Sequence, residues 1–422
     1  MMNKTFSFKL HADGEGAVLA KTAAETITEL YTSAPKTTVT NNNITYNIAP
    51  SVRLMSDRLG GTTTDAEGGN IRYYGDSQSE IVPAWQSNRT SILANQVFGS
   101  AFTSESNCNA MLTALTTCSA NYSKLGFSSA SECEAGLPTL LKGMANVSTV
   151  SELITEYCIN DTYPLNNYIY FNCNDYSNQS SSTCETWRII GVFDGKVKIM
   201  RNNTIGSLAW DYDKNDNSSL TTYDNNWHTA TLQKLLNNSY YNGTGTITYY
   251  NLGSSVSLNM NNIGIKNTAT RNMIAETTYY LGGWDDGLIY PNQIYGYERG
   301  KTVYTGRPTS WTGKIALPYP SDYSYSSDFS ICTKATNSYD NLCIGTNWMY
   351  PIMSADGTQY SWLLTSDSST SSNAWYIFSD GKVYDGNITN IDFWVAPVLY
   401  LSSELEIESG DGSSSNPYKL SA

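Results

Sequence analysis

Hydrophobic and polar positions are interleaved most densely in residues 362–401. The spacing of the apolar residues predicts short buried strands, and no packing requirement explains the polar and aromatic residues between them. A rigid sheet that carries Tyr, Trp, Ser and Asn is typical of a binding surface, because aromatic rings give contact area at low entropic cost. The residues assigned to the buried strands are Trp362, Leu363, Leu364, Ala374, Trp375, Ile377, Val383, Val395, Pro397, Val398 and Leu399.

We expect a ligand-binding face in residues 366–394, where aromatic side chains stand in polar surroundings as the anchors of binding sites often do. Its members are expected to be exposed on one surface, above buried Trp362, Trp375, Val383 and Val398. The expected contact residues are Ser366, Asp367, Ser369, Ser371, Asn373, Tyr376, Asp380, Lys382, Tyr384, Asp385, Asn387, Asn390, Asp392, Phe393 and Trp394.

Helical periodicity marks the first part of the chain. Residues 17–31 place Leu19, Ala23, Ile27 and Leu30 on one helical face, and we interpret residues 1–67 as an N-terminal attachment segment.

A second helical region follows. Residues 91–102 and 105–118 are predicted helices, and two capping-box sequences, at residues 129–132 and 149–152, start two more. We therefore predict a helical insertion over residues 76–165, between residues 68–75 and 166–422 of one domain. The latter part is β-rich, with amphipathic helices expected near residues 227–236 and 270–280.

Several segments occur in a characteristic order: GGNIRYYG from Gly68, NNYIYFNC from Asn166, NQIYGYERGKTVYTG from Asn292, WLLT from Trp362, AWYIFSDGKV from Ala374, VAPVLYLSSELEI from Val395 and SGDGSSSNPYKL from Ser409. This order resembles the C-type lectin fold in its formylglycine-generating-enzyme-like form. It is similar to variable proteins diversified by retroelements and to surface proteins of gut Firmicutes and their phages. Where diversified domains often have Val-Arg-Pro, this chain has Val395-Ala396-Pro397.

The resemblance implies an α+β fold, namely a C-type lectin-like domain with antiparallel sheets and two helices. In the family, residues matching Gly75 and Asn166 follow one another almost directly, which implies that the helical segment between them is an insertion. Such folds host unrelated activities, so the resemblance is more specific for fold than for function.

Charge and composition narrow the class of protein. The 25 Lys and Arg against 38 Asp and Glu give a net charge of -13, without a basic cluster, which argues against a nucleic-acid partner. Only 15% of residues are charged while Tyr reaches 32, a composition typical of an extracellular β-rich surface. No segment approaches the about 18 apolar residues of a membrane span, so we expect no membrane insertion by this chain.

The expected location is extracellular, on a cell surface or on a virion. The N-terminus lacks the apolar core of a signal peptide. Two explanations stay open: a signal or anchor has been removed, or the protein leaves the cell by another route, such as a phage particle released by lysis.

The even number of cysteines indicates disulfides, since no Cys-x-x-Cys motif supports zinc or a dithiol centre. We expect local pairs of Cys173 with Cys184 and of Cys332 with Cys343, each across a polar loop. The remaining four are expected to pair within the insertion; they are Cys108, Cys118, Cys133 and Cys158.

Catalytic motifs are sparse, and we predict no enzyme activity and no cofactor. The two histidines, His11 and His228, are far apart, and no hydrolase or phosphate-binding motif occurs. The resemblance implies oxidase chemistry only with a reactive cysteine pair, and Cys332 and Cys343 have no neighbouring base.

A calcium site is an alternative for one acidic segment. Residues 211–219 carry oxygen ligands at alternate positions, but the sixth and twelfth positions do not fit an EF-hand. A solvated turn is the preferred interpretation, and an irregular calcium site at Asp211, Asp213 and Asn215 is the alternative.

Together these features predict a non-enzymatic ligand-binding protein, an adhesin or receptor-binding protein on a cell surface, pilus or phage tip. Its expected partner is a protein or glycan on another cell or host surface. The alternative is a structural subunit of an extracellular filament or envelope, which assembles with itself through the N-terminal segment or the insertion. Lattice contacts along the insertion would favour this alternative.

Overall fold

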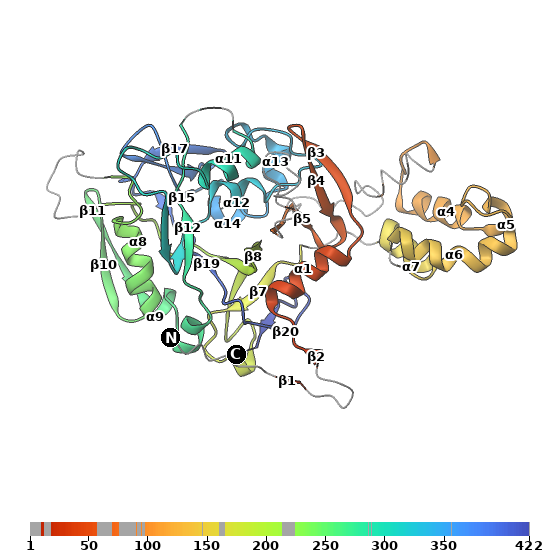
Figure 1. Ribbon diagram of the computed structural model, residues 1–422, viewed down its shortest axis with the longest axis horizontal. Helices are drawn as coiled ribbons and strands as arrows, with labels where there is room; N and C mark the ends of the chain where they lie inside the picture. Colours follow the sequence, from red (N-terminus) through yellow and green to blue (C-terminus); the bar gives the residue numbers. More distant parts are fainter. Residues whose placement is uncertain are drawn as a thin grey trace, which may run out of the picture.

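Antiparallel sheets and short helices make this an α+β protein (Figure 1). The computed structural model describes residues 10–11, 18–56, 70–75, 90, 94, 98–145, 147–159, 165–212, 224–285, 287, 289–355 and 357–421. Within these residues no helix is both long and apolar enough to cross a bilayer.

A large sheet runs through the main body in the order β14-β19-β9-β8-β6-β5-β4-β3, with β7 paired to β8 off this path. All pairings within it are antiparallel. Its strands are β3 (Thr37–Asn41), β4 (Ile44–Ala49), β5 (Leu54–Ser56), β6 (Ile71–Tyr73), β7 (Tyr168–Phe171), β8 (Glu185–Phe193), β9 (Lys196–Arg201), β14 (Ile315–Ala316) and β19 (Val398–Tyr400).

The chain leaves this sheet and returns to it at adjoining places on one strand. Ile71 and Arg72 of β6 pair with Val192 and Gly191 of β8. On re-entry β7 pairs with residues 185–188 of β8, and the Ile189 N–H donates to the Asn167 carbonyl over 2.7 Å. Strands β6 and β7 therefore lie end to end along β8, which is the geometry that an insertion between them requires.

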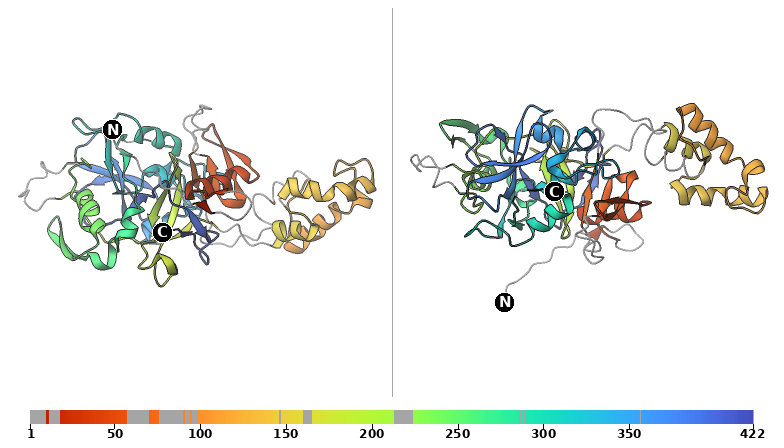
Figure 2. Two further views of the ribbon diagram at one scale, coloured as in Figure 1. Left: turned by 60° about the horizontal axis from the view of Figure 1, so that its bottom comes forward. Right: turned by 90° about the horizontal axis from the view of Figure 1, so that it is seen from above.

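The inserted segment folds around a hydrophobic core of its own (Figure 2). Its helices are α4 (Glu105–Leu115), α5 (Cys118–Asn121), α6 (Ala130–Ala145) and α7 (Val150–Ile154), which continues as η4 (Thr155–Ile159). The predicted capping box at residues 149–152 is present, and the Glu152 N–H donates to Thr149 Oγ1. At the other predicted start the Glu132 N–H donates to Ser129 Oγ, while the Glu132 carboxylate accepts from the Ser128 N–H. Part of the predicted helix at residues 91–102 lies outside the described residues.

The two expected local pairings are confirmed, and the other four cysteines pair within the insertion as expected. The local pairs, Cys173–Cys184 and Cys332–Cys343, close loops of the main body. The pairs within the insertion are Cys108–Cys158 and Cys118–Cys133. Four disulfides indicate folding in an oxidising compartment.

The N-terminal part joins the main body. Helix α1 (Ala23–Ser33) begins at Thr22, which forms a capping box with Glu25, and it buries Ala23, Ala24, Ile27 and Tyr31 in the main core. Strands β3, β4 and β5 extend the large sheet. The helix is shorter than the expected residues 17–31, because Leu19 lies in strand β2 (Val18–Leu19). The apolar face of α1 packs into the protein's own core, and an attachment role for residues 1–67 stays a prediction.

A smaller sheet carries the region that the sequence singled out. Its order is β17-β16-β15-β18, with β18 parallel to β15 and the other pairs antiparallel. The strands are β15 (Tyr360–Ser366), β16 (Asn373–Ile377), β17 (Val383–Asn387) and β18 (Phe393–Trp394).

The two helices predicted after residue 166 are not both present. Helix α8 (Thr231–Leu235) and its continuation η6 (Leu236–Tyr240) lie at the first position. At the second, the short helix α10 (Thr268–Asn272) is followed by strand β12 (Thr277–Tyr280), so the expected helix over residues 270–280 is wrong. The Thr-Thr-Tyr-Tyr sequence of β12 pairs with β13 (Ser310–Gly313), and its β-branched and aromatic residues favour that outcome.

Short elements complete the main body. They are β1 (Leu10–His11), β2 (Val18–Leu19), η1 (Pro50–Val52), η5 (Tyr176–Asn178), β10 (Thr246–Asn251), β11 (Ser254–Asn259), α9 (Met260–Ile263), α11 (Pro291–Glu298), α12 (Pro320–Ser324), η7 (Thr336–Ser338), α13 (Asn341–Gly345), α14 (Tyr350–Ser354), β20 (Ile407–Ser409) and β21 (Lys419–Leu420).

Buried charges join the large sheet to helices α11 and α12. Asp322 binds Arg72 of β6 over 2.7 Å and Lys198 of β9 over 2.5 Å. Glu298 accepts hydrogen bonds from the Ser321 N–H and hydroxyl, at 2.8 and 2.6 Å. Buried charges require such partners, so this network fixes how the two helices sit against the sheet.

Candidate functional site

The small sheet carries aromatic side chains across its strands. Tyr376 of β16 is paired with Trp362 of β15 and with Tyr384 of β17, and Tyr360 is paired with Phe393 of β18. Paired residues lie on the same face of a sheet, so these rings share one face. We call the following residues the aromatic platform: Tyr360, Trp362, Tyr376, Phe378, Tyr384 and Phe393.

The rings of the platform pack against one another. The Phe393 ring centroid lies 4.3 Å from that of Trp362 and 4.4 Å from that of Tyr376. Phe378 lies 4.9 Å from Tyr360 and 5.7 Å from Tyr384 between ring centroids. These are the separations of stabilising aromatic pairs. The packing holds the rings in place before any ligand arrives.

The side chains of the platform range from buried to exposed. Trp362 is fully buried, Tyr360, Tyr376 and Phe378 are half-buried, and Tyr384 is 37% exposed. Burial raises the pKa of Tyr376, and the charge of Asp385 adds to the effect. The Tyr376 hydroxyl therefore stays protonated at neutral pH. The platform thus offers apolar ring surface together with phenolic hydroxyl groups.

The reverse face of the same sheet is core. Trp375 stacks on Trp284 with ring centroids 4.3 Å apart and an interplanar angle of 20°. The expectation that Trp362, Trp375, Val383 and Val398 are buried is confirmed. Because large buried side chains pack beneath the platform, the sheet supports the platform rigidly.

Two residues expected on the surface are buried. Asp367 is 3% exposed, because its carboxylate accepts hydrogen bonds from the N–H groups of Ser369 and Thr370 and so closes the turn. Phe393 is 7% exposed, because it fills the space between Trp362 and Tyr376. In the sequence, a polar turn and an aromatic residue in a polar stretch both look like exposed contacts.

The predicted contact residues also do not share one surface. Tyr384 and Asp385 are neighbours in a strand, so their side chains point to opposite faces. Asp385 is paired with Trp375 and accepts a hydrogen bond from Asn373 Nδ2 over 2.7 Å. Exposed members are Ser369, Tyr384 and Asp392. Half-buried members are Ser366, Ser371, Asn373, Tyr376, Asp380, Lys382, Asp385, Asn387, Asn390 and Trp394.

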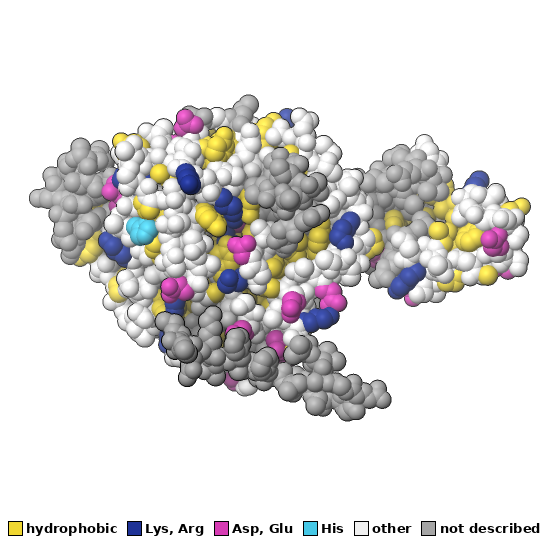
Figure 3. Space-filling model, viewed as in Figure 1, with side chains coloured by type: hydrophobic (Ala, Val, Ile, Leu, Met, Phe, Trp, Pro, Cys, Tyr) yellow, Lys and Arg dark blue, Asp and Glu magenta, His cyan; other side chains and the backbone are white. Residues whose placement is uncertain are grey.

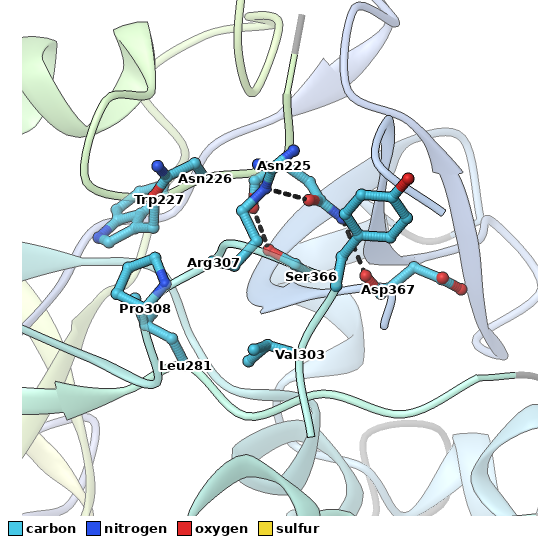
Figure 4. A pocket seen from close by; sticks show the side chains of 10 residues that line it. Asn225, Asn226, Trp227, Leu281, Val303, Arg307, Pro308, Ser366 and Asp367 are labelled. Carbon is cyan, nitrogen blue, oxygen red and sulfur yellow. Dashed lines mark hydrogen bonds between the residues drawn. The ribbon is translucent and has the colours of Figure 1, made fainter. Parts of the chain in front are cut away.

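A single asparagine holds the loop that follows β15 (Figure 4). The buried side-chain amide of Asn225 donates to three backbone carbonyls, those of Asp367, Thr370 and Asn373, each over 2.9 Å. Its amide oxygen accepts from Arg307 Nε over 3.0 Å, and its backbone carbonyl accepts from the Ser366 hydroxyl over 2.7 Å. The loop is therefore preorganised by a residue from a distant part of the chain.

A small cavity of about 10 Å³ lies beside this asparagine, between Arg307, Trp227 and Pro308 (Figure 4). A space of that size holds no more than one water molecule. The cavity belongs to the packing of the loop and is too small for a ligand.

Sequence reasoning missed three residues of this region: Tyr360, Phe378 and Asn225. The period of two along the strands could have found the first two, since Tyr360 precedes Trp362 by two positions and Phe378 follows Tyr376 by two. Nothing in the sequence near Asn225 connects it with residues 366–373.

The described residues give little support for a calcium site at Asp211. Asp213 and Asn215 lie outside the described residues, and elsewhere in the described chain no group of three His, Cys, Asp or Glu side chains could hold a metal. Burial raises the pKa of Asp211 to about 6, and its carboxylate accepts from the Thr231 N–H over 2.8 Å at the start of α8. Asp211 thus satisfies the first backbone N–H of α8.

Charge is dispersed over the described part of one face of the molecule (Figure 3). On the face drawn in Figure 3, Lys and Arg side chains stand singly among Asp, Glu and apolar groups.

A scan against protein-family models, a search of curated proteins and a search of solved structures each found no match for this chain.

Proposed function

We propose that this chain is a non-enzymatic ligand-binding protein of the C-type lectin-like class. It recognises a protein or glycan on another cell or host surface through the aromatic platform. The observation that carries the proposal is the platform itself: buried and half-buried rings, held by mutual contacts at 4.3–5.7 Å between ring centroids, end in the exposed Tyr384. Rigid aromatic anchors of this kind dominate the binding energy of many interfaces.

The architecture supports the same class. The structure combines a large antiparallel sheet, a second sheet with long loops and an insertion at a strand junction. This combination is consistent with the resemblance of several sequence segments to C-type lectin fold surface proteins. The disulfides suit display outside the cell, on a surface, a pilus or a phage tip.

The test is attachment of the fluorescently labelled protein to a printed glycan array and to intact bacterial and epithelial cells. The critical variant is Tyr384→Ala, which removes the exposed anchor. The matched control is Tyr297→Ala, because Tyr297 is a 43% exposed tyrosine of α11 outside the platform. We expect at least a tenfold loss of attachment for the first variant and none for the second.

Equal attachment of both variants would refute a platform-based site. A wild-type protein that attaches to no probe and instead polymerises in solution would favour a structural subunit of a filament or envelope. Electron microscopy and light scattering on the same preparations detect that outcome.

A further inference from the structure

The protein holds several of its own arginines against tyrosine rings. The guanidinium carbon of Arg188 lies 3.8 Å from the ring centroid of Tyr168. That of Arg299 lies 3.4 Å from the Tyr295 ring centroid, and the Glu298 carboxylate accepts a hydrogen bond from Arg299 Nη1 over 3.4 Å. A guanidinium is planar, so it stacks on a ring while its N–H groups donate at the edge. A tyrosine ring beside an oxygen acceptor is thus an arrangement in which this chain holds arginine.

The aromatic platform presents the same groups without a cation of its own. Tyr384 is 37% exposed, and Tyr360 and Tyr376 are half-buried. Within the described part of the chain, no Lys or Arg lies over these three rings, and their hydroxyls form no hydrogen bond with another residue. The ring centroids of Tyr376 and Tyr384 lie 6.5 Å apart. The three tyrosines therefore offer ring faces and hydroxyl oxygens that the described chain leaves unused.

The charge next to these rings is negative. Burial raises the pKa of the Tyr376 hydroxyl, and the charges of Asp385 and Asp380 raise it further. The neighbouring Lys382 is neutralised by an ion pair with Asp380 over 2.6 Å. Asp385 accepts from the Asn373 amide and has no cationic partner among the described residues. Since the whole chain also carries a net charge of -13, a cationic partner is complementary both locally and at long range.

We propose that the platform receives an arginine side chain of a protein partner. This inference rests on the proposed function and names the chemistry of the ligand at that same site. The guanidinium stacks on the exposed Tyr384 ring, and phenolic oxygens of the platform accept from its N–H groups. A neutral glycan gains nothing from the negative charge beside Tyr376. Lysine fits less well than arginine, because its ammonium is compact and strongly hydrated.

The test is a titration with a labelled octapeptide of alternating arginine and glycine, followed by fluorescence polarisation. Two counterparts replace arginine by lysine or by citrulline, which keeps the shape of arginine without its charge. We expect roughly tenfold weaker binding of the citrulline peptide and several-fold weaker binding of the lysine peptide. Tyr384→Ala should weaken binding of the arginine peptide roughly tenfold, while the matched control Tyr297→Ala should leave it unchanged.

A second pair of variants tests the local charge. Asp380→Asn removes a carboxylate and releases the Lys382 ammonium, and both changes oppose a cationic ligand, so we expect roughly fivefold weaker binding of the arginine peptide. Glu29→Gln is the matched control, because it breaks an exposed ion pair with Lys21 in another part of the chain and changes the net charge equally. Its affinity for the peptide should stay that of the wild type.

Equal binding of the arginine and lysine peptides, or equal binding to the wild type and Tyr384→Ala, would overturn the inference, because net charge alone then explains the binding. Attachment to cells or glycans that depends on Tyr384, without binding of the arginine peptide, would also overturn it but leave the proposed function intact. The expected peptide binding, with cell attachment that does not depend on Tyr384, would support the arginine site and refute the proposed function.

Discussion

The side-chain amide of Asn225 donates to the backbone carbonyl of Asp367 over 2.9 Å, although 142 residues separate them. Two more carbonyls of the same loop share that amide group. The loop beside the aromatic platform therefore takes its shape from a residue outside it.

Replacing Asn225 by Ala should destabilise the main body by roughly 3 kcal/mol, since three carbonyls each lose a donor and Arg307 loses an acceptor. Urea unfolding followed by tryptophan fluorescence measures the change. Asn272→Ala is the control: Asn272 is exposed at the end of α10, and we expect a change within about 0.5 kcal/mol. A small effect at Asn225 would mean that the loop holds its shape unaided.

Phe393 and Tyr384 belong to one platform but should respond differently to truncation. Phe393→Ala leaves a cavity between Trp362 and Tyr376, so we expect a loss of about 3–5 kcal/mol of stability. Tyr384→Ala removes a partly exposed ring and should cost less than about 1 kcal/mol. Thermal unfolding of both variants checks this. Similar losses would show that the platform edge is as essential to folding as its centre.

Glu298 should make stability depend on pH. Burial raises its pKa from the usual 4.5 to about 7, against the opposing effects of Arg299 and the Ser321 hydrogen bonds. Between these values the folded protein holds the proton more tightly than the unfolded chain. The stabilising contribution is therefore complete below pH 4.5 and is lost as the pH rises through about 7.

Glu298→Gln cannot titrate, so it isolates this contribution. The stability of the wild type relative to the variant should fall by on the order of 3 kcal/mol between pH 4.5 and pH 7.5. Urea unfolding at half-unit pH intervals gives the difference. A difference that stays constant over this range would refute the linkage.

Removing the Cys108–Cys158 disulfide should unfold the insertion alone. The bond joins α4 to η4 across 50 residues, and closing such a loop stabilises by roughly 4 kcal/mol in the chain-entropy model. In the double variant Cys108→Ser, Cys158→Ser, the backbone amides of residues 98–159 should exchange hydrogen for deuterium faster than in the wild type. Mass spectrometry measures this exchange. The melting of the main body should not move, because the cores are separate. Faster exchange in the insertion together with a lower melting temperature of the main body would show that the two cores are coupled.

Local patterns were enough to find several features of this protein. Thr149 and Glu152 predicted a helix start, because both partners of a capping box lie within one turn. Cys173 and Cys184 predicted a disulfide, because a short polar loop brings its ends together. The apolar positions of residues 362–401 predicted buried strands, because side chains alternate between faces with a period of two.

The tertiary structure decided which residues are exposed and what they contact. Asp367 and Phe393 look like surface residues in the sequence, yet one closes a turn and the other fills an aromatic cluster. The platform needs strands β15 and β18 side by side, and their pairing is parallel and non-local. Asn225 reaches its loop only in the folded chain. Burial and hydrogen bonding depend on neighbours that folding brings together, and no sequence window contains them.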